Sequence, residues 1–519
     1  RMCAQCASNC RRAECVEWLV KSLAVMPVTF PELFQLRLLD KNWNDAVNTL
    51  LSLFRGLQYK LPCQEYTKIE CYFLATHFSE FQHHVPWQVH ALCALKSWNM
   101  LKHFSLHINT DVYRSCRWLL CSRTCHGVLS IDNIIRLCVA KCFDNSTVLQ
   151  SVVAAWKLLD VVVHKKMMCW WVYLACKHIQ LFKYGLIPLC RGKMELLYAL
   201  WFECDIQKNT KTIRLLLAVQ KKLIDYMSDT VRKDLENSAK LVELLKEMVR
   251  IGVPSSRANH IRDFFSIVQN VRLPWAPETI ICDITPIKRY SSSSKPLLVT
   301  LRLKNNQSMN VLIKQEDVRT DRLAMMIGYW ISSFAERVHV HYYDVFPLSK
   351  NSGCVVMIPE ATTLYDIRKK TSLLNFIMTQ NPSQTSAEIR ERMVSSCAGA
   401  CLLAFTMGLG DRHLENILVT SSGHLAHVDF GYVLGDDPKH VSTPMRITED
   451  MVDAMGGRNS PTFVSFIQRT QKGYESMRLH APFWYHLLSS ECFIFENPSR
   501  PWKRIRDHVL DRFARSESI

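Results

Sequence analysis

The sequence predicts a multidomain protein in which an α-helical array precedes a two-lobed α+β fold, with a small β-rich lobe and a large, mainly helical lobe. At 519 residues the chain is too long for one hydrophobic core. Residues 1–255 contain few Gly and Pro and show repeated helical periodicity, whereas alternating, strand-like runs begin near residue 270. The 48% hydrophobic and 21% charged content is that of a folded globular chain.

The first half of the chain is expected to be helical throughout. Its apolar residues recur at helical spacing, and short polar joints separate the segments, so an antiparallel array without a regular repeat is expected. The amphipathic helices are expected over Phe30–Leu36, Trp43–Leu53, Ile131–Cys142, Thr147–Leu159, Ile213–Met227 and Val231–Val249. The apolar stretch Ser151–Leu174 is interrupted by charges such as Asp160 and Lys165, which favours a buried helix pair over a membrane span.

The small lobe is expected to start with a hairpin. Arg272–Pro277 breaks the helical pattern, and Leu298–Lys304 then alternates apolar and polar residues with period two. Asn305 and Asn306 suit a turn, and a return strand ends in Lys314. A lysine at that strand end is suited to contact a nucleotide phosphate.

The large lobe carries clear helix signals. Thr385 and Glu388 form a capping-box pattern, and Thr448 is expected to cap a second helix that Gly456–Gly457 ends. The first of these helices should bury one face, made of residues at fourfold spacing: Ile389, Met393, Cys397 and Cys401.

The most informative stretch is Gly410–Asn416 (GDRHLEN), followed by His427–Gly431 (HVDFG). A transferring phosphoryl group spreads negative charge, so its catalysis needs positioning and charge stabilisation. Asn and Asp supply hard oxygen ligands for Mg²⁺, and a nearby Asp or His can handle an attacking hydroxyl. The apolar runs on either side of Ser421–Gly423 predict a hairpin that brings Asn416 and Asp429 together.

These motifs resemble those of the phosphatidylinositol 3-/4-kinases and their protein-kinase relatives, over about residues 265–490 clearly and 60–255 weakly. Gly435–Lys439 and Thr443–Ile447 look most like the activation loop of class III phosphatidylinositol 3-kinases. The resemblance implies three regions: a helical segment at 1–59, a helical accessory domain at 60–255 and a catalytic domain at 256–519. Within the last, the small lobe should span about 265–358 and the large lobe about 362–519.

The resemblance also implies roles for individual residues, with ATP and Mg²⁺ (or Mn²⁺) as cofactors. His413 and Asp411 would handle the attacking hydroxyl, with Arg412 bracing their loop, and Asn416 and Asp429 would hold the metal. The nucleotide would be bound by residues of the phosphate loop, the small lobe and the hinge: Lys314, Ser292, Ser293, Asp321, Tyr343, Met357, Ile358 and Ala361. For hinge hydrogen bonds Ile358 or Ala361 is favoured, because Pro359 lacks an N–H.

The substrate is expected to be selected by Lys439, His440 and Arg446. Asp436 and Asp437 offset the positive charge of these three residues. The resulting electrostatic field attracts a multiply phosphorylated headgroup poorly and suits plain phosphatidylinositol. The resemblance to class III phosphatidylinositol 3-kinases implies phosphorylation of its 3-position. A 4-kinase, a related protein serine/threonine kinase and an inactive helical scaffold are the alternatives. The class III family usually has Arg where this chain has Asp436, and it continues beyond this chain's end into an amphipathic helix.

The net charge of +17 favours an acidic partner, and a membrane surface is preferred to nucleic acid because no nucleic-acid-binding motif is present. The expected location is cytoplasmic, peripheral on endosomal or other internal membranes, with a regulatory or scaffold subunit and no transmembrane span. The 21 cysteines show no disulfide framework, and the cluster Cys3, Cys6, Cys10 and Cys15 fits no standard zinc spacing.

Overall fold

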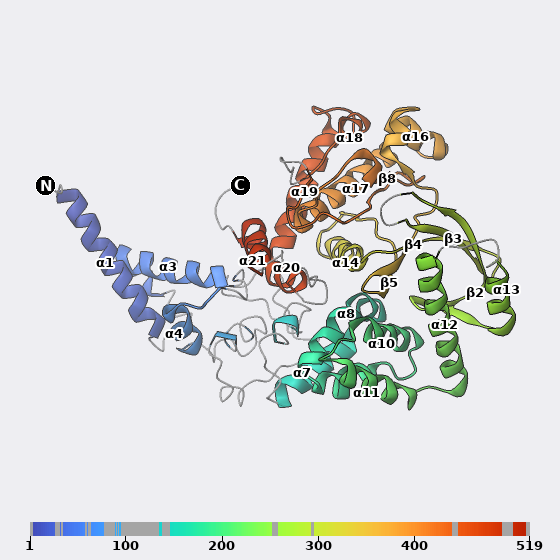
Figure 1. Cartoon of the computed structure of the whole chain (residues 1–519). Helices are drawn as coiled ribbons and strands as arrows, with labels where there is room; N and C mark the ends of the chain where they lie inside the picture. The colour runs from blue at the N-terminus through green and yellow to red at the C-terminus, as the bar shows by residue number, and fades with distance from the viewer. Residues whose placement is uncertain are drawn as a thin grey trace. The chain divides into compact units, whose positions relative to one another are not determined.

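The computed structural model describes residues 4–25, 32, 35–57, 60, 64–76, 89, 91, 93–94, 134–137, 146–251, 258–291, 295–438, 445–489 and 502–514. The chain forms two compact units (Figure 1). One contains residues 1–159, 478–488 and 509–519, and the other contains residues 160–477 and 489–508. The three-region division expected from the sequence remains a prediction.

The first unit is helical in its described parts. Helices α1 (Ala4–Val25) and α3 (Lys41–Leu57) pack against each other, and α1 also contacts α4 (Lys68–Thr76). Arg12 of α1 pairs with Asp45 of α3 at 2.5 Å. Three further helical elements belong to this unit, namely α7 (Ser146–Leu158), α20 (Ala481–Leu488) and the short π-helix η7 (Leu510–Ala514).

The helical predictions hold wherever the chain is described. Trp43–Leu53 lies in α3, Thr147–Leu159 corresponds to α7, and only parts of Phe30–Leu36 and Ile131–Cys142 are described. The stretch Ser151–Leu174 is two helices, α7 and α8, and the Asp160 carboxylate caps the second by accepting the Val162 N–H at 2.7 Å. Among the described helices, none has the length and apolar character to cross a membrane.

The second unit begins with the rest of the helical array. Ile213–Met227 and Val231–Val249 were expected as helices and form α11 and α12. The elements in order are α8 (Val161–Lys177), η4 (Phe182–Leu186), α9 (Ile187–Leu189), α10 (Met194–Gln207), α11 (Ile213–Ile224), α12 (Asp229–Ile251) and α13 (Ala258–Ile267).

A six-stranded antiparallel sheet follows, in the order β1-β2-β3-β4-β6-β5. The expected hairpin is present: β3 and β4 pair with Leu298 opposite Leu312, and Asn306 takes a positive φ of 64° in the turn. The strands are β1 (Val271–Leu273), β2 (Ala276–Arg289), β3 (Leu297–Leu303), β4 (Ser308–Lys314), β5 (Val345–Ser349) and β6 (Ser352–Val356).

The long strand β2 has no clear signal in the sequence. It contains Pro277 and Pro286, and its register against β3 shifts twice, so apolar and polar residues do not alternate along it. Helix α14 (Arg319–Phe334) packs beside the sheet. Arg322 of α14 makes two bonds, of 2.7 and 3.3 Å, with the buried Glu203 carboxylate of α10, which ties the helical array to the small lobe.

The large lobe is mainly helical, as expected. Thr385 and Glu388 form the predicted capping box of α17, and the predicted face of that helix is buried. Thr448 caps α18 by accepting the Met451 N–H, and Gly456 and Gly457 follow this helix with positive φ. The elements are β7 (Thr362–Thr363), α15 (Leu364–Arg368), α16 (Leu373–Gln380), α17 (Ser386–Met407), η6 (Leu414–Asn416), β8 (Ile417–Val419), β9 (Leu425–His427), α18 (Glu449–Ala454), α19 (Pro461–Arg478) and α21 (Trp502–Val509).

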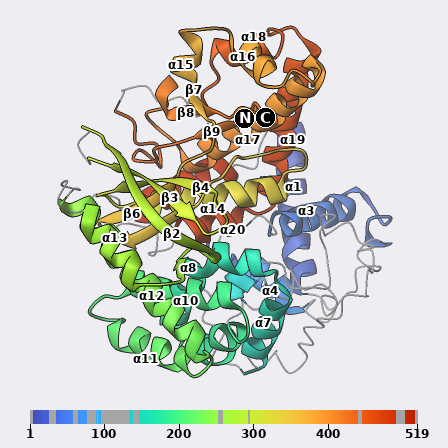
Figure 2. The ribbon, with the colours of Figure 1, turned by 90° about the vertical axis from the view of Figure 1, so that its right-hand side faces the viewer.

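Within the second unit the sheet lies between two groups of helices. Figures 1 and 2 both place helices α8 to α12 on one side of the six-stranded sheet and α15 to α19 on the other. The helical array followed by a β-rich lobe and a helical lobe is the expected architecture, and the candidate site lies on the hairpin β8–β9 of the helical lobe.

Candidate active site

The hairpin β8–β9 holds the two proposed metal ligands at its open end. Ile417 pairs with His427 and Val419 with Leu425, and Gly423 takes a φ of 89° in the turn. The Val428 N–H donates to the Asn416 carbonyl at 3.2 Å, so Asp429 directly follows the residue that pairs with Asn416. The predicted hairpin is thus present. Asn416 lies just before its first strand and Asp429 just after its second, on neighbouring segments.

Arg412 braces this open end from behind. Its buried guanidinium donates to the carbonyls of Gly410 at 2.8 Å and Val428 at 2.7 Å, and also to the Asp429 carbonyl. The same group lies 5.7 Å from the centre of the Phe430 ring. Burial lowers the pKa of Arg412, against the attraction of Asp429 and Asp411. These bonds support the bracing role that the sequence suggested for Arg412.

The side chains of Asn416 and Asp429 suit a hard cation. The Asn416 amide nitrogen donates to the Asp411 carbonyl at 2.9 Å, which leaves the amide oxygen as a ligand atom. Within the described residues, the Asp429 carboxylate accepts one hydrogen bond, from the Gly431 N–H at 3.3 Å. Both Asp429 and Asp411 have positive φ, 61° and 51°, a backbone strain that is common at functional sites. The donor set therefore fits Mg²⁺ or Mn²⁺.

His413 lies beside these groups and is about 42% exposed. Its Nδ1 accepts the Glu415 N–H at 3.2 Å and thereby caps η6. In a neutral imidazole with this bond, the ring proton is on Nε2. That Nε2 lies 4.0 Å from an Asp411 carboxylate oxygen, so the two residues predicted to handle the hydroxyl are close together.

Lys314 ends β4 as predicted and lies among carboxylates. Its ammonium is 2.8 Å from Glu316 and 4.0 Å from Asp321. Burial alone would lower the pKa of Lys314, but attraction to Asp321 and Glu316 outweighs it and raises that pKa. Burial raises the pKa of Asp321 to about 6 although Lys314 opposes it, and Asp429 contributes to this shift.

Tyr343 lies next to this cluster. It is buried, and burial followed by the charge of Asp321 raises its pKa well above the usual value. The charge of Asp429 acts on Tyr343, Asp321 and Lys314 alike, so these predicted nucleotide residues of the small lobe lie near the proposed metal ligand of the large lobe.

The predicted hinge follows β6. The Met357 N–H donates to the Asn310 carbonyl at 2.9 Å, so Met357 has no N–H left for an adenine base. Ile358 is buried, Ala361 is half-buried, and Glu360 turns the chain with a φ of 52°. Ile358 and Ala361 thus remain the candidates for backbone recognition of the base.

Some of the predicted residues lie outside the described part of the chain. They are Ser292 and Ser293 of the proposed phosphate loop and Lys439 and His440 of the proposed substrate loop. Arg446 is described and half-buried, and the structure brings it to none of the groups above.

One polar residue near the site, Glu316, was missed from the sequence, and so were the contacts that Asp436 and Asp437 make. The Glu316 carboxylate contacts the Lys314 ammonium, and Glu316 follows Lys314 by only two residues. This short spacing could have indicated the contact. Asp437 accepts the Asp411 N–H at 3.3 Å, and Asp436 pairs with Arg504 of α21. The contacts of Asp437 and Asp436 join segments that are distant in the sequence, so no local sequence pattern predicts them.

Together, a small antiparallel lobe that carries Lys314 and a helical lobe that presents His413, Asn416 and Asp429 define a kinase catalytic domain. Residues 308–498 match the family model described as phosphatidylinositol 3- and 4-kinase. Over these residues the chain thus resembles the phosphatidylinositol 3- and 4-kinases, as its motifs indicated, and a helical array followed by a kinase domain is confirmed as its architecture.

Curated relatives support the same family. A phosphatidylinositol 3-kinase of Saccharomyces cerevisiae is 28% identical over 302 residues, which cover 55% of this chain and 33% of the yeast protein. A phosphatidylinositol 3-kinase of Schizosaccharomyces pombe is 27% identical over 309 residues, covering 56% and 38%. A human phosphatidylinositol 4-phosphate 3-kinase subunit is 26% identical over 280 residues, covering 48% and 17%. The chain spans about a third of the length of the two yeast relatives.

Proposed function

We propose that this protein transfers the γ-phosphoryl group of ATP to the 3-hydroxyl of phosphatidylinositol, giving phosphatidylinositol 3-phosphate at a membrane surface. The observation that carries the proposal is the convergence of Lys314 of the small lobe with Asp429 of the large lobe, where Asp429 follows the residue that pairs with Asn416 and His413 lies beside Asp411. A bond forms between the inositol oxygen and the γ-phosphorus, the bond to ADP breaks, and the hydroxyl proton is lost.

The residues of the site would divide this work. Lys314 would contact the ATP phosphates, and its raised pKa keeps it cationic. Asn416 and Asp429 would hold the divalent cation, which neutralises phosphate charge when bound. With Nδ1 capping η6, neutral His413 would donate Nε2–H to the γ-phosphate, and it could act as a base only after that cap breaks.

The choice of phosphatidylinositol and of its 3-position rests on two supports. The relatives named above carry 3-kinase names. The chain after Phe430 places Asp436 and Asp437 near the catalytic loop, which disfavours headgroups with several phosphates. A 4-kinase is the second candidate. An inactive scaffold is disfavoured because Lys314, His413, Asn416 and Asp429 are all in place.

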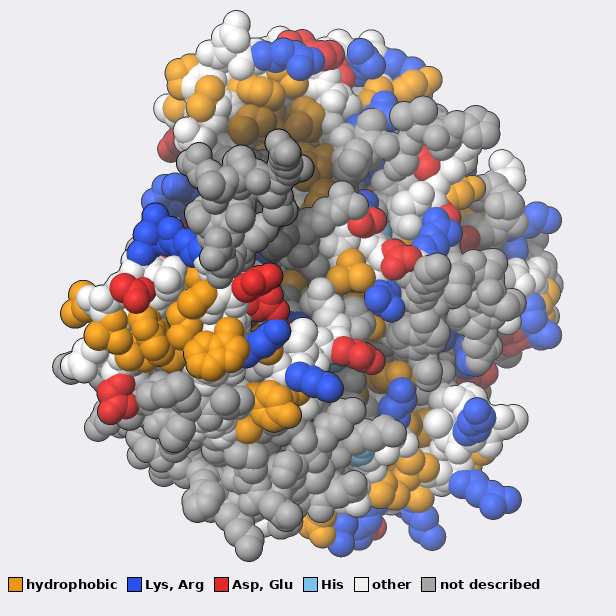
Figure 3. All heavy atoms as spheres, turned by 90° about the vertical axis from the view of Figure 1, so that its left-hand side faces the viewer, with side chains coloured by type: hydrophobic (Ala, Val, Ile, Leu, Met, Phe, Trp, Pro, Cys, Tyr) orange, Lys and Arg blue, Asp and Glu red, His pale blue; other side chains and the backbone are white. Residues whose placement is uncertain are grey.

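The membrane association would be peripheral, on endosomal, autophagic or other internal membranes of the cytoplasm. A net charge of +17 gives a general attraction to anionic lipid. On the face in Figure 3, the described Lys and Arg side chains form several separate groups among acidic and hydrophobic ones. Such a distribution suits weak surface contact, so a regulatory or scaffold subunit would deliver the enzyme to its membrane.

A lipid kinase assay tests the proposal. The purified chain is incubated with labelled ATP, Mg²⁺ or Mn²⁺ and phosphatidylinositol vesicles, and the phosphorylated ring position is identified. A 3-phosphate product that disappears with His413→Ala supports the proposal. A 4-phosphate product would replace it with the second candidate, and no lipid product from a chain that binds ATP would overturn it.

A further inference from the structure

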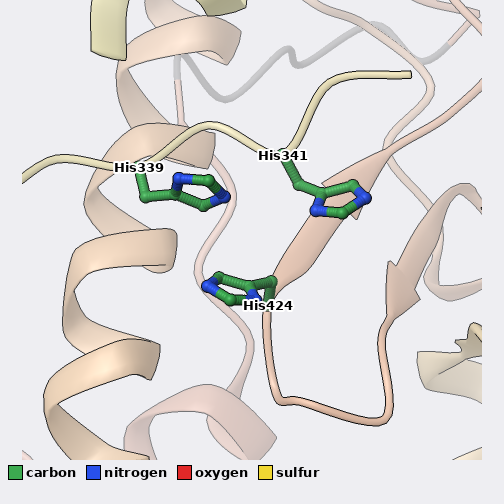
Figure 4. Close-up of side chains that lie close together, drawn as sticks. All are labelled: His339, His341 and His424. Carbon is green, nitrogen blue, oxygen red and sulfur yellow. The ribbon is translucent and has the colours of Figure 1, made fainter. Parts of the chain in front are cut away.

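Three histidines gather in the second unit, apart from the residues discussed above. His339 and His341 belong to the segment between α14 and β5, and His424 belongs to the turn of β8–β9. One nitrogen from each ring lies within 4.8 Å of the other two. In Figure 4 the rings of His339 and His424 lie one above the other, and the ring of His341 lies beside them.

The backbone fixes the positions of two of the three residues. The His339 N–H donates to the Ser395 carbonyl of α17 at 3.2 Å, and α17 approaches so closely that a Cβ at Gly399 would lie 2.1 Å from the His339 carbonyl oxygen. The His424 N–H donates to the Thr420 hydroxyl at 3.0 Å. The backbones of His339 and His424 are thus held in place, and His341 follows His339 by two residues.

The distances suit a tetrahedral metal ion. With Zn–N bonds of about 2.0–2.1 Å, the ligand nitrogens of a zinc site lie about 3.3 Å apart. The ring centres of His339 and His424 are 4.6 Å apart, and His341 lies 6.2 and 6.1 Å from them. Moving the nitrogens from within 4.8 Å to about 3.3 Å takes small ring rotations.

His424 also has the outer support that metal-binding histidines use. Its Nδ1 lies 2.9 Å from the Ser422 hydroxyl, which in turn lies 2.9 Å from the Thr420 hydroxyl. When Nδ1–H donates along this chain, Nε2 is left free to act as a ligand. Burial lowers the pKa of each ring, that of His424 to about 4, so all three are neutral and able to bind a metal at neutral pH.

We propose that His339, His341 and His424 form a transition-metal site that takes Zn²⁺ through three imidazole nitrogens, with water or another small ligand in the fourth position. Imidazole suits zinc and copper but not Mg²⁺, so this site is chemically distinct from the oxygen ligands of the catalytic centre. Arg392 contacts the Ser422 carbonyl and opposes positive charge at His424, which sets the site toward moderate affinity.

The metal would join two parts of the second unit. His424 is on the hairpin whose other end carries Asn416 and Asp429, and His341 is two residues from Tyr343 of the nucleotide cluster. A bound ion would fasten the turn of the hairpin to the chain that leads into β5. Zn²⁺ should therefore slow amide exchange across β8–β9, whether or not the proposed lipid kinase reaction occurs.

Cobalt(II) substitution provides the first test. The chain is stripped with a chelator and titrated with Co²⁺ while its visible absorption is recorded. The proposal expects intense tetrahedral bands that saturate at one equivalent without the near-ultraviolet absorption of a cobalt–thiolate bond. Bands accompanied by thiolate absorption would place the metal on cysteines and overturn the proposal. The absence of tetrahedral bands would also overturn it.

Variants localise the site. His424→Ala should weaken Co²⁺ and Zn²⁺ binding by more than about 100-fold, since loss of outer-shell support alone costs about 10–100-fold, and Ser422→Ala should show that smaller loss. His178→Ala, a half-buried histidine outside the cluster, is the matched control and should bind like the wild type. Melting curves in chelator show that each variant folds. Equal binding by wild type and a folded His424→Ala variant would overturn the proposal, and so would unchanged amide exchange in β8–β9 with Zn²⁺.

Discussion

The carboxylate of Asp436 pairs with the guanidinium of Arg504, 68 positions further along the chain in α21. The partner of this acid is thus a cation on α21. The neighbouring Asp437 accepts the Asp411 N–H at 3.3 Å, so this part of the chain is held between the catalytic loop and α21.

The Asp436–Arg504 pair should couple weakly but measurably. Its side chains are 29% and 38% exposed, so Asp436→Arg or Arg504→Asp should each cost up to about 1 kcal/mol, and the double exchange should recover much of that. A double-mutant cycle by chemical denaturation measures the coupling. Arg506→Asp, on an exposed position of the same helix, is the control. Additive effects of the two single changes would contradict the pairing.

Asp429→Ala should abolish phosphoryl transfer and leave the fold intact. The carboxylate has one described hydrogen bond, to Gly431, so its loss should cost little stability. Loss of a metal ligand removes several kcal/mol of transition-state stabilisation, and three decades of rate correspond to about 4 kcal/mol. Turnover and melting temperature are measured together. Asp453→Ala, an exposed acid of α18, should keep full turnover. Retained transfer in Asp429→Ala would refute the metal assignment.

Asp321 should make stability depend on pH between about 4 and 7. Its folded-state pKa is raised to about 6 by burial, against a usual value of 3.8, so the unfolded chain loses this proton at lower pH than the folded chain. Stability is therefore lost as pH rises through this window, by roughly 2–3 kcal/mol in all. Asp321→Asn removes the titration.

The measurement is the difference in unfolding free energy between wild type and Asp321→Asn at several pH values. That difference should shift in favour of the variant from pH 4 to 7 and then level off. Glu316→Gln, which keeps Asp321, should retain most of the wild-type slope. A pH-independent difference between wild type and Asp321→Asn would contradict the buried, raised-pKa environment of this carboxyl group.

Gly399→Ala should destabilise the second unit by about 1–3 kcal/mol, although alanine is the better helix former. A Cβ at this position of α17 would lie 2.1 Å from the His339 carbonyl oxygen, which is backbone and cannot rotate away. Ala398→Gly, one position earlier, should cost about 1 kcal/mol through helix propensity, and the loss of its buried methyl group adds about 1 kcal/mol. Thermal melts compare them. If Gly399→Ala is as stable as wild type, the close packing of α17 on the His339 segment is wrong.

The sequence by itself determined the resemblance to the phosphatidylinositol 3- and 4-kinases, the class of fold, most helices and the catalytic hairpin. These features depend on short-range signals: helical periodicity, the capping box at Thr385, and a turn at Gly423 between apolar runs. Such signals act over a few residues, so they can be found without knowing what packs on them.

Only the tertiary structure decided which distant groups meet. It brought His424 to His339 and His341, paired Asp436 with Arg504 and Glu203 with Arg322, and raised the pKa of Asp321 by burial. It also formed β2, whose two prolines and shifted register hide its pairing from any local pattern. Contacts of this kind depend on packing between segments far apart in the chain, because burial and partner charges are properties of the folded arrangement and not of the local sequence.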